Sequence, residues 1–299
     1  MRHGLNSMTT STSVLHPEAF LSPLAVESAV RIALEEDLGR AGDVTSIATI
    51  PEAAQTRATL VARQAGVIAG LPLAVETFRR LSPEIAIVAH ARDGAVVSKG
   101  LHVLTITGPA RAVLAGERTA LNFVGRLSGV ATLTAAYVRN TAATKMRICC
   151  TRKTTPGLRA LEKYAVRCGG GFNHRFGLDD AILIKDNHIA VAGGVRPVLE
   201  QARKHAGHLV KVEIEVDTLD QLRDVLDTGL ADVVLLDNMD IPTLKQAVQM
   251  TAGRAVLEVS GSVTESSIAA IAQTGVDYAS SGALTHSAPN FDVALDIEL

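Results

Sequence analysis

The sequence lacks tryptophan, and aromatic residues of all kinds make up only 3% of its 299 residues. It also lacks a surplus of either charge, because 29 Lys and Arg residues stand against 31 Asp and Glu residues, for a formal net charge of -2. Proteins that bind nucleic acid generally carry a basic surplus and stack aromatic rings on bases. We therefore expect no nucleic-acid partner.

Cysteines and long apolar runs are also scarce. The three cysteines, Cys149, Cys150 and Cys168, form neither a disulfide framework nor a CxxC pair. This pattern is typical of a reducing, cytoplasmic compartment, and we expect the three side chains in the core. No uncharged run reaches the roughly 18 apolar residues that span a bilayer, so we expect no membrane association. The opening MRHGLNSMTTSTSVLHPEAF lacks the apolar segment of a secretory signal, and we expect residues 1–23 to form a flexible polar tail.

Apolar residues, in contrast, make up 47% of the chain, enough for the core of one large domain or two modest ones. In the first half they recur with a helical period at residues 24–39, 73–81, 110–125 and onward to about 143. Short strand-like runs, separated by Gly and Pro, lie at residues 56–63, 66–69, 85–91 and 103–107. This mixture of hairpins and helices predicts an α+β domain.

After Lys145 the pattern changes to short apolar runs that alternate with helical segments. Six such runs occur, at residues 147–150, 181–184, 210–216, 233–236, 255–259 and 277–280. The helical segments fall at 157–166, 195–205, 218–227, 242–250 and 264–273, the last with Thr264 as its expected N-cap. This alternation predicts parallel strands joined by right-handed crossovers.

Two architectures fit six such strands: an incomplete barrel and an open doubly wound sheet. Polar residues follow strand after strand, at 151–154, 185–188, 237–238, 260–261 and 281–282. In a barrel these strand ends converge on one opening, whereas in an open sheet the first and sixth strands lie far apart. No Gly-rich nucleotide-binding loop follows the first strand. We therefore expect a small or incomplete α/β barrel.

One side of the expected opening is cationic. Arg152 and Lys153 directly follow a buried strand, and His174 and Arg175 end the loop CGGGFNHRFG. Because few carboxylates are nearby in the sequence, we expect an anionic ligand, and arginine binds carboxylates and phosphates bidentately. Three further cations lie on a predicted amphipathic helix, where we expect them to be solvated: Arg159, Lys163 and Arg167.

The opposite side is neutral and the middle is acidic. Ser260-Gly261 and Ser280-Ser281-Gly282 end the last two strands, where open backbone N–H groups and a following helix favour a phosphate. Between the two sides lie Glu215 and Asp237, which would repel a phosphate unless a divalent ion or sugar hydroxyls lay between. Glu213 is either an internal partner of a lysine such as Lys211 or Lys185, or a ligand group. His188 and His286 are expected to be satisfied structurally.

Longer motifs across these segments resemble the quinolinate phosphoribosyltransferase family. They are GERTALN, TRKTTPGLRALEKYAVRCGGGFNHRFGLDDAILIKDNHI, VEIEV, LLDN, EVSGS and SSGALTH, within a resemblance that extends from GDVTS near Gly42 to ALTHSAP near Ala288. The resemblance implies an N-terminal α/β sandwich domain over residues 24–127 and an α/β barrel over 128–285, with 286–299 packing back on the first domain. It also implies a homodimer in which the N-terminal domain of one subunit covers the barrel opening of the other.

The same resemblance implies a reaction and a set of roles. Phosphoribosyl would be transferred from phosphoribosyl pyrophosphate to quinolinate with decarboxylation, giving nicotinate mononucleotide, pyrophosphate and CO2 in NAD biosynthesis, with Mg²⁺ as cofactor. The implied quinolinate-binding residues are Arg152, Lys153, His174 and Arg175, with Arg118 from the neighbouring subunit. Lys185 would lie near the reacting centre, and Glu215 and Asp237 would hold the ribose hydroxyls and Mg²⁺. The implied catalytic residues are Lys153, Lys185, Glu215 and Asp237.

The 5′-phosphate would be bound by Ser260, Gly261, Ser262 and Gly282. Relatives often read SGG where this sequence has Ser260-Gly261-Ser262. Serine keeps the backbone N–H of this position but lacks the freedom of glycine at positive φ, so the loop geometry is expected to differ.

Two other functions compete with this transferase hypothesis. A Schiff-base aldolase would use Lys153 or Lys185 as a nucleophile in an apolar pocket. A non-catalytic anion-binding protein would tolerate the loss of Glu215 or Asp237 with its ligand affinity intact. Arginines crowd the lysines and the motifs look intact, so both alternatives are disfavoured.

Overall fold

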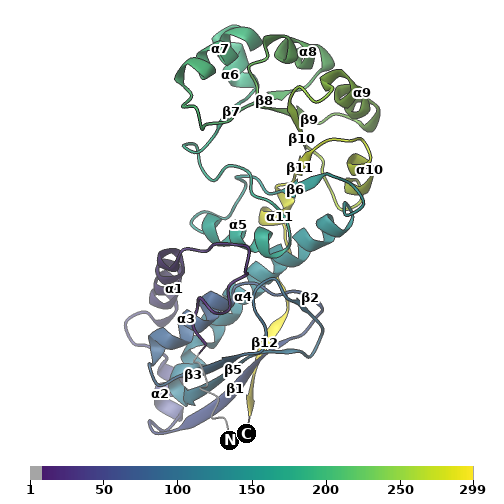
Figure 1. Cartoon of the computed structure of the whole chain (residues 1–299). Coiled ribbons are helices and arrows are strands. Elements are labelled where there is room, and N and C mark those ends of the chain that lie inside the picture. Colours follow the sequence, from purple (N-terminus) through teal and green to yellow (C-terminus); the bar gives the residue numbers. More distant parts are fainter. Residues whose placement is uncertain (1–8, 299) are drawn as a thin grey trace, which may run out of the picture. The chain divides into compact units, whose positions relative to one another are not determined.

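The computed structural model describes residues 9–298 and divides into two compact units (Figure 1). Residues 1–8 of the expected tail lie outside this range. The first unit contains the described residues up to Leu133, the segment Thr155–Gly170 and the residues from Ala288 onward. The second contains Thr134–Thr154 and Gly171–Ser287.

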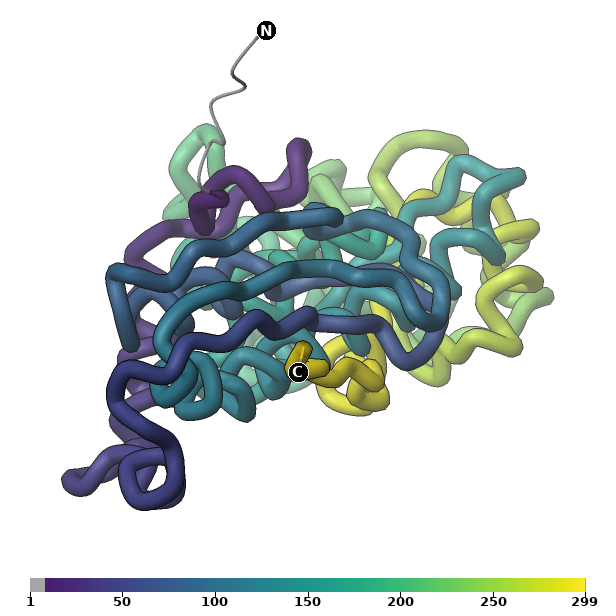
Figure 2. Tube along the Cα trace, turned by 90° about the horizontal axis from the view of Figure 1, so that it is seen from below, coloured from purple at the N-terminus to yellow at the C-terminus, as the bar shows by residue number. Residues whose placement is uncertain are grey.

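A four-stranded antiparallel sheet forms the centre of the first unit. Its strands are ordered β12 (Val293–Glu298), β1 (Gln55–Ala62), β5 (His102–Pro109) and β3 (Ala86–Ala89). In Figure 2 the segments of β1, β5 and β3 run side by side. A two-stranded ribbon pairs β2 (Gly66–Val67) with β4 (Val96–Val97). Strand β12 joins the edge of the sheet, so the C-terminal segment packs on this unit.

Helices pack on one face of this sheet, and the hydrophobic core of the first unit lies between the helices and the sheet. They are α3 (Leu71–Leu81) and α4 (Ala110–Arg139), with α1 (Pro23–Leu38) packed against α3. The core joins Phe78 of α3 and Leu121 of α4 to Leu60, Leu104 and Ile106 of the strands. The short helix α2 (Val44–Thr49) was not predicted, because six residues are too few for a periodicity.

One predicted helix end is wrong. The sequence predicts two helices that meet near Gly125, whereas α4 is a single helix of 30 residues. A glycine inside a helix costs only about 1 kcal/mol, and here two glycines let another segment approach. The Gly125 carbonyl accepts a hydrogen bond from Phe291 N–H at 2.8 Å, and a Cβ at Gly129 would lie 2.1 Å from the Pro289 carbonyl oxygen.

The two units have limits that differ from those of the expected domains. The expected boundary between residues 127 and 128 falls within α4. The helix α5 (Arg159–Cys168), which the sequence assigns to the barrel, contacts the first unit instead. Tyr164 of α5 donates a hydrogen bond to Asp93 at 3.0 Å, which anchors the helix there.

Burial of α5 also corrects one side-chain prediction. Lys163, expected on a solvated face, is only 3% exposed, and Glu162 beside it is fully buried. Arg159 and Arg167 are half-buried. The sequence pattern shows an amphipathic helix, but it does not show that the surrounding unit also covers the polar face.

The second unit is built on a six-stranded parallel sheet. Its order is β6 (Arg147–Cys149), β11 (Tyr278–Ser280), β10 (Val256–Ser260), β9 (Val233–Asp237), β8 (Val212–Val216) and β7 (Ile182–Ile184). The first and last strands in sequence, β6 and β11, are hydrogen-bonded neighbours. This cyclic order, interrupted between β6 and β7, confirms the incomplete barrel and excludes the open doubly wound sheet.

Helices follow most of these strands. They are α6 (Asp186–Ala192), α7 (Val195–His205), α8 (Leu219–Thr228), α9 (Ile241–Thr251), α10 (Ile268–Ala272) and α11 (Ala283–His286). The sequence predicts α7, α8, α9 and the region of α10, but not the short α6 and α11. Helix α10 begins at Ile268 and not at Thr264, because Thr264 forms a local turn whose hydroxyl accepts the Ser267 N–H at 3.2 Å. All three cysteines are free and buried, as expected. Within residues 9–298, the helices are too short or too polar to cross a bilayer.

Candidate active site

A cavity of about 770 Å³ opens at the carboxyl ends of the barrel strands. It is lined entirely by residues of the second unit. The predicted site residues that line it are Arg152, Lys153, His174, Arg175, Lys185, Glu215, Asp237, Ser260, Gly261, Ser262 and Gly282. The convergence of strand ends on one opening, expected from the order of polar residues, is therefore confirmed.

Arg118 is the predicted site residue outside this set. It lies on α4 in the first unit, and its side chain is exposed. Its expected role depends on a second subunit and is taken up below.

The cationic side of the cavity has two neighbouring guanidinium groups. Arg152 Nε is buried and has no hydrogen-bond partner among the described residues. Burial lowers the pKa of Arg175, and the positive charge of Arg152 lowers it further. The Arg175 guanidinium donates from Nη1 to the Ala181 carbonyl at 3.1 Å. Two cations held close together with an unsatisfied donor indicate a site for an anion.

The acidic residues lie across the middle of the cavity. Glu215 Oε2 accepts from Lys185 Nζ at 2.7 Å, and Asp237 Oδ2 accepts from Asn238 Nδ2 at 2.7 Å. Lys185 is about half-exposed. A Schiff-base lysine works from apolar surroundings, so this exposed ion pair argues further against the aldolase.

The third part of the cavity is the loop after β10. Gly261 has φ +81, and a Cβ there would lie 2.1 Å from Asn238 Oδ1, so only glycine fits. The next residue, Ser262, also has a positive φ of 51. The helix after this loop, α10, begins only at Ile268. The loop after β10 therefore offers N–H groups without a helix N-terminus, whereas Gly282 after β11 is the N-cap of the four-residue α11.

Replacing Ser262 with glycine is expected to raise the free energy of unfolding by about 0.5–1 kcal/mol. The left-handed conformation costs a non-glycine residue about 1–2 kcal/mol, and the greater chain entropy of glycine offsets part of the gain. Urea unfolding measures the difference. Ala206→Gly, at a φ of -66, is the control and is expected to lose stability. A loss in Ser262→Gly would contradict the interpretation.

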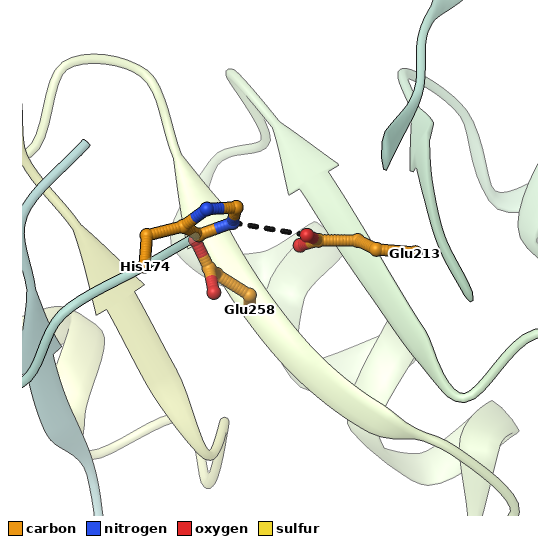
Figure 3. Close-up of side chains that lie close together, drawn as sticks. All are labelled: His174, Glu213 and Glu258. Atoms are coloured by element: carbon orange, nitrogen blue, oxygen red, sulfur yellow. Dashed lines mark hydrogen bonds and ion pairs between the residues drawn. The ribbon is translucent and has the colours of Figure 1, made fainter. Parts of the chain in front are cut away.

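His174, Glu213 and Glu258 form a largely buried triad of side chains (Figure 3). His174 Nε2 lies 2.9 Å from Glu213 Oε2 and 3.6 Å from Glu258 Oε1. Glu213 therefore pairs with a histidine, whereas Lys211 pairs with Asp232 and Lys185 with Glu215. The proposed lysine partners of Glu213 are thus wrong.

Sequence reasoning found Glu215 within a strand but missed several other lining residues, among them Glu258. Glu258 lies within β10, two residues before Ser260 and so on the same face. That alternation is a signal that could have found it. Other lining residues outside the predicted set include Asn238 and His286. His188, expected to be structural, does accept a hydrogen bond from Lys185 N–H at 2.9 Å.

Comparison with known proteins gives concordant matches. Residues 43–128 match the family model "Quinolinate phosphoribosyl transferase, N-terminal domain", and residues 130–296 match the model for its C-terminal domain. The carboxylating nicotinate-nucleotide pyrophosphorylase of Mycobacterium leprae is 43% identical, with 91% of this chain and 97% of that protein covered. A tobacco protein named quinolinate phosphoribosyltransferase (decarboxylating) is 41% identical over 91% of this chain and 82% of its own length. The nicotinate-nucleotide pyrophosphorylase structure from Francisella tularensis superposes with a TM-score of 0.90 at 39% identity, covering 94% of this chain and 98% of that one.

Proposed function

Because the chain belongs to the quinolinate phosphoribosyltransferase family, we propose that it transfers phosphoribosyl from phosphoribosyl pyrophosphate to quinolinate. The products are nicotinate mononucleotide, pyrophosphate and CO2, as a step of NAD biosynthesis. The observation that carries this proposal is the sorting of one cavity into a cationic side, an acidic middle and a loop of open amides. A dicarboxylate and a phosphorylated sugar together need these three environments.

Quinolinate binds at the cationic side. Arg152 supplies its buried, unpartnered Nε, and Arg175 and Lys153 add positive charge on the same wall. Arginine forks suit planar carboxylates. Both ring nitrogens of His174 are engaged within the protein, since Nδ1 accepts from Arg175 N–H at 2.9 Å and Nε2 faces Glu213. His174 therefore shapes this wall and orients Arg175.

The sugar and pyrophosphate bind at the middle and at the loop side. Glu215 and Asp237 hold the ribose hydroxyls, and the N–H groups of Ser260 to Ser262 with Gly282 hold the 5′-phosphate. Mg²⁺ is the proposed cofactor. Two carboxylates, one of them already paired with Lys185, fit an ion that keeps several waters and binds mainly through substrate phosphates. When bound, it neutralises charge on the pyrophosphate.

The chemistry follows from where the charges lie. As the bond from C1′ to pyrophosphate breaks, the quinolinate ring nitrogen bonds to C1′, and Lys185 and Lys153 stabilise the departing anion. One such preorganised donor is worth about 3 kcal/mol in a transition state. The ribosylated ring nitrogen is cationic, so it stabilises the electron pair that stays on the adjacent ring carbon when the carboxylate departs as CO2, and that carbon then takes up a proton.

The site is proposed to be completed in a cytoplasmic homodimer. Exposed Arg118 on α4 would reach a quinolinate carboxylate in the neighbouring subunit. The three free thiols fit a reducing compartment.

The direct test incubates purified protein with Mg²⁺, phosphoribosyl pyrophosphate and quinolinate labelled in the departing carboxylate. Labelled CO2 and nicotinate mononucleotide are expected in equal amounts and only with all three additions. Transfer without CO2 release, or no reaction with quinolinate, would overturn the proposal.

Mixing two inactive variants is expected to restore activity. Arg118→Ala and Lys153→Ala impair different contributors to one site, so a heterodimer regains one intact site of its two, or about a quarter of wild-type activity after statistical exchange. Turnover after subunit exchange measures this. The control mixes Lys153→Ala with Arg152→Ala, two changes on the same wall of one subunit's cavity, and recovers nothing. No recovery in the first mixture after proven exchange would show that Arg118 does not act in the neighbouring site.

A further inference from the structure

Glu258 is a buried carboxyl group that the proposed reaction does not use. Its side chain is 6% exposed, yet it lines the substrate cavity. Figure 3 shows it converging with Glu213 of β8 on the imidazole of His174. The Oε1 atoms of both glutamates are buried without a hydrogen-bond partner among the described residues. An arrangement this costly to bury needs a compensating ion or proton.

A metal ion does not fit this triad. The three ligand atoms lie within 4.8 Å of one another, close enough for a divalent ion. However, His174 Nδ1 accepts the Arg175 N–H, so Nε2 carries the proton of the neutral ring and donates to Glu213. A metal-binding imidazole has the reverse pattern, with Nδ1–H donating outward. Arg152 and Arg175 beside the triad also disfavour a cation.

A proton on Glu258 fits the triad better than a metal ion does. Glu258 faces the Glu213 carboxylate from β8 and the His174 ring from the loop, and Leu235 of β9 and Tyr278 of β11 are its register neighbours. Burial raises the pKa of Glu258 to about 7, and the charge of Glu213 raises it further, while His174 and Ser280 oppose the rise. A proton on Glu258 removes one of two adjacent buried charges.

We propose that Glu258 holds a proton when the dicarboxylate substrate is bound, so that substrate binding is linked to uptake of a proton at this side chain. The inference rests on the proposed function, because it takes a dianion to be the ligand of the cationic wall. Two carboxylates entering beside Arg152 and Arg175 would be repelled by an ionised Glu258. Protonation keeps the positive charge of the wall available to the substrate.

The direction in which the KM for quinolinate changes with pH follows from the linkage between substrate binding and proton uptake. Below its pKa, Glu258 is already protonated and substrate binds without proton uptake. Above it, each binding event takes up a proton, so the KM for quinolinate rises about tenfold per pH unit on the alkaline side of pH 7. The turnover number kcat, measured at saturation, lacks this slope, because the bound state is protonated throughout.

Glu258→Gln is the decisive variant, because it replaces the acid with a neutral isostere. Its KM for quinolinate is expected to stay within about twofold over the range where the wild-type value climbs. Glu258→Asp retains a titrating group and keeps the slope. Glu265→Gln removes an exposed carboxyl on the loop after β10 and keeps the wild-type slope. A merely structural role would change KM equally at all pH values.

A second measurement uses the wild-type protein alone, in case Glu258→Gln fails to fold. Calorimetric titration with phthalate, an unreactive dicarboxylate, in buffers of different ionisation enthalpy counts protons taken up on binding. About one proton per site is expected on the alkaline side of pH 7, and almost none about one pH unit below pH 7, where phthalate is still mostly a dianion.

The outcomes separate the two proposals. Nicotinate mononucleotide formation with a KM slope that persists in Glu258→Gln, or phthalate binding without proton uptake, overturns the linkage alone. No turnover with quinolinate, but proton-linked phthalate binding, overturns the reaction and keeps the linkage. A protein that neither turns over quinolinate nor binds phthalate overturns both.

Discussion

Replacing Arg152 with alanine is expected to lower kcat/KM for quinolinate by about 10²–10³-fold. Truncating one member of a buried charge pair costs about 2–5 kcal/mol, and each 1.4 kcal/mol is roughly tenfold. The KM for phosphoribosyl pyrophosphate is expected to change by less than about threefold, because its phosphates bind across the cavity. Steady-state kinetics with each substrate varied in turn measures both values.

Two further variants sharpen this test. Arg152→Lys keeps the charge but loses the planar fork, so an intermediate loss is expected. Arg196→Ala removes an exposed arginine of α7, whose nearest acid is 3.9 Å away, and is expected to leave both KM values unchanged. Equal losses for the two substrates in Arg152→Ala would contradict the assignment of quinolinate to the cationic side.

Replacing Glu162 with alanine is expected to lower the free energy of unfolding of the first unit by about 3–5 kcal/mol, the usual cost of breaking a buried ion pair. Glu162 is fully buried and accepts from Arg126 Nε at 3.1 Å and Nη2 at 2.6 Å. It also accepts from the Thr155 N–H at 3.0 Å and hydroxyl at 2.8 Å. Its removal takes two hydrogen bonds from the half-buried Arg126 guanidinium, which also donates to the Ala288 carbonyl, and takes the acceptor of the Thr155 N–H.

Urea unfolding measures this loss, and an exposed ion pair provides the matched control. Glu35→Ala breaks the pair with Arg31, whose side chains are 62% and 51% exposed, and is expected to cost less than about 1 kcal/mol. Glu162→Gln, which keeps an acceptor oxygen, is expected to fall between the two. A loss in Glu162→Ala no larger than that of the control would show that the buried pair adds nothing to stability.

The fold could be predicted where the pattern of apolar residues matches the packing. The six barrel strands are short apolar runs bounded by polar residues, so sequence rhythm locates all of them. The single helix α4 could not be predicted, because Gly125 and Gly129 look like helix ends until the chain that packs on them is known. The very short β4 and α6 carry too few residues for a period. Likewise, nothing local shows that α5 leaves the barrel.

The site could be predicted where its residues lie at or just beyond the carboxyl ends of the strands. This holds for Arg152, Lys185, Asp237 and Ser260, and the strand ends of a barrel share one opening. Partners within the site depend on strand order in space, and sequence spacing does not give it. Glu213 and Glu258 come from β8 and β10, which β9 separates, and His174 enters from a loop. Their convergence therefore required the structure.

The barrel wall is open between β6 and β7, and a loop segment enters the barrel there. Strands β6 and β7 do not meet, and the segment around Phe172 adds to β6 instead, where Phe172 N–H donates to the Ile148 carbonyl at 2.7 Å. His174 follows Phe172 by two residues. The segment that pairs with β6 at this gap therefore also carries His174 to Glu213 and Glu258. Extra strands that closed the barrel would have to pair with the edge of β6 that Phe172 now occupies, and would displace the segment that carries His174.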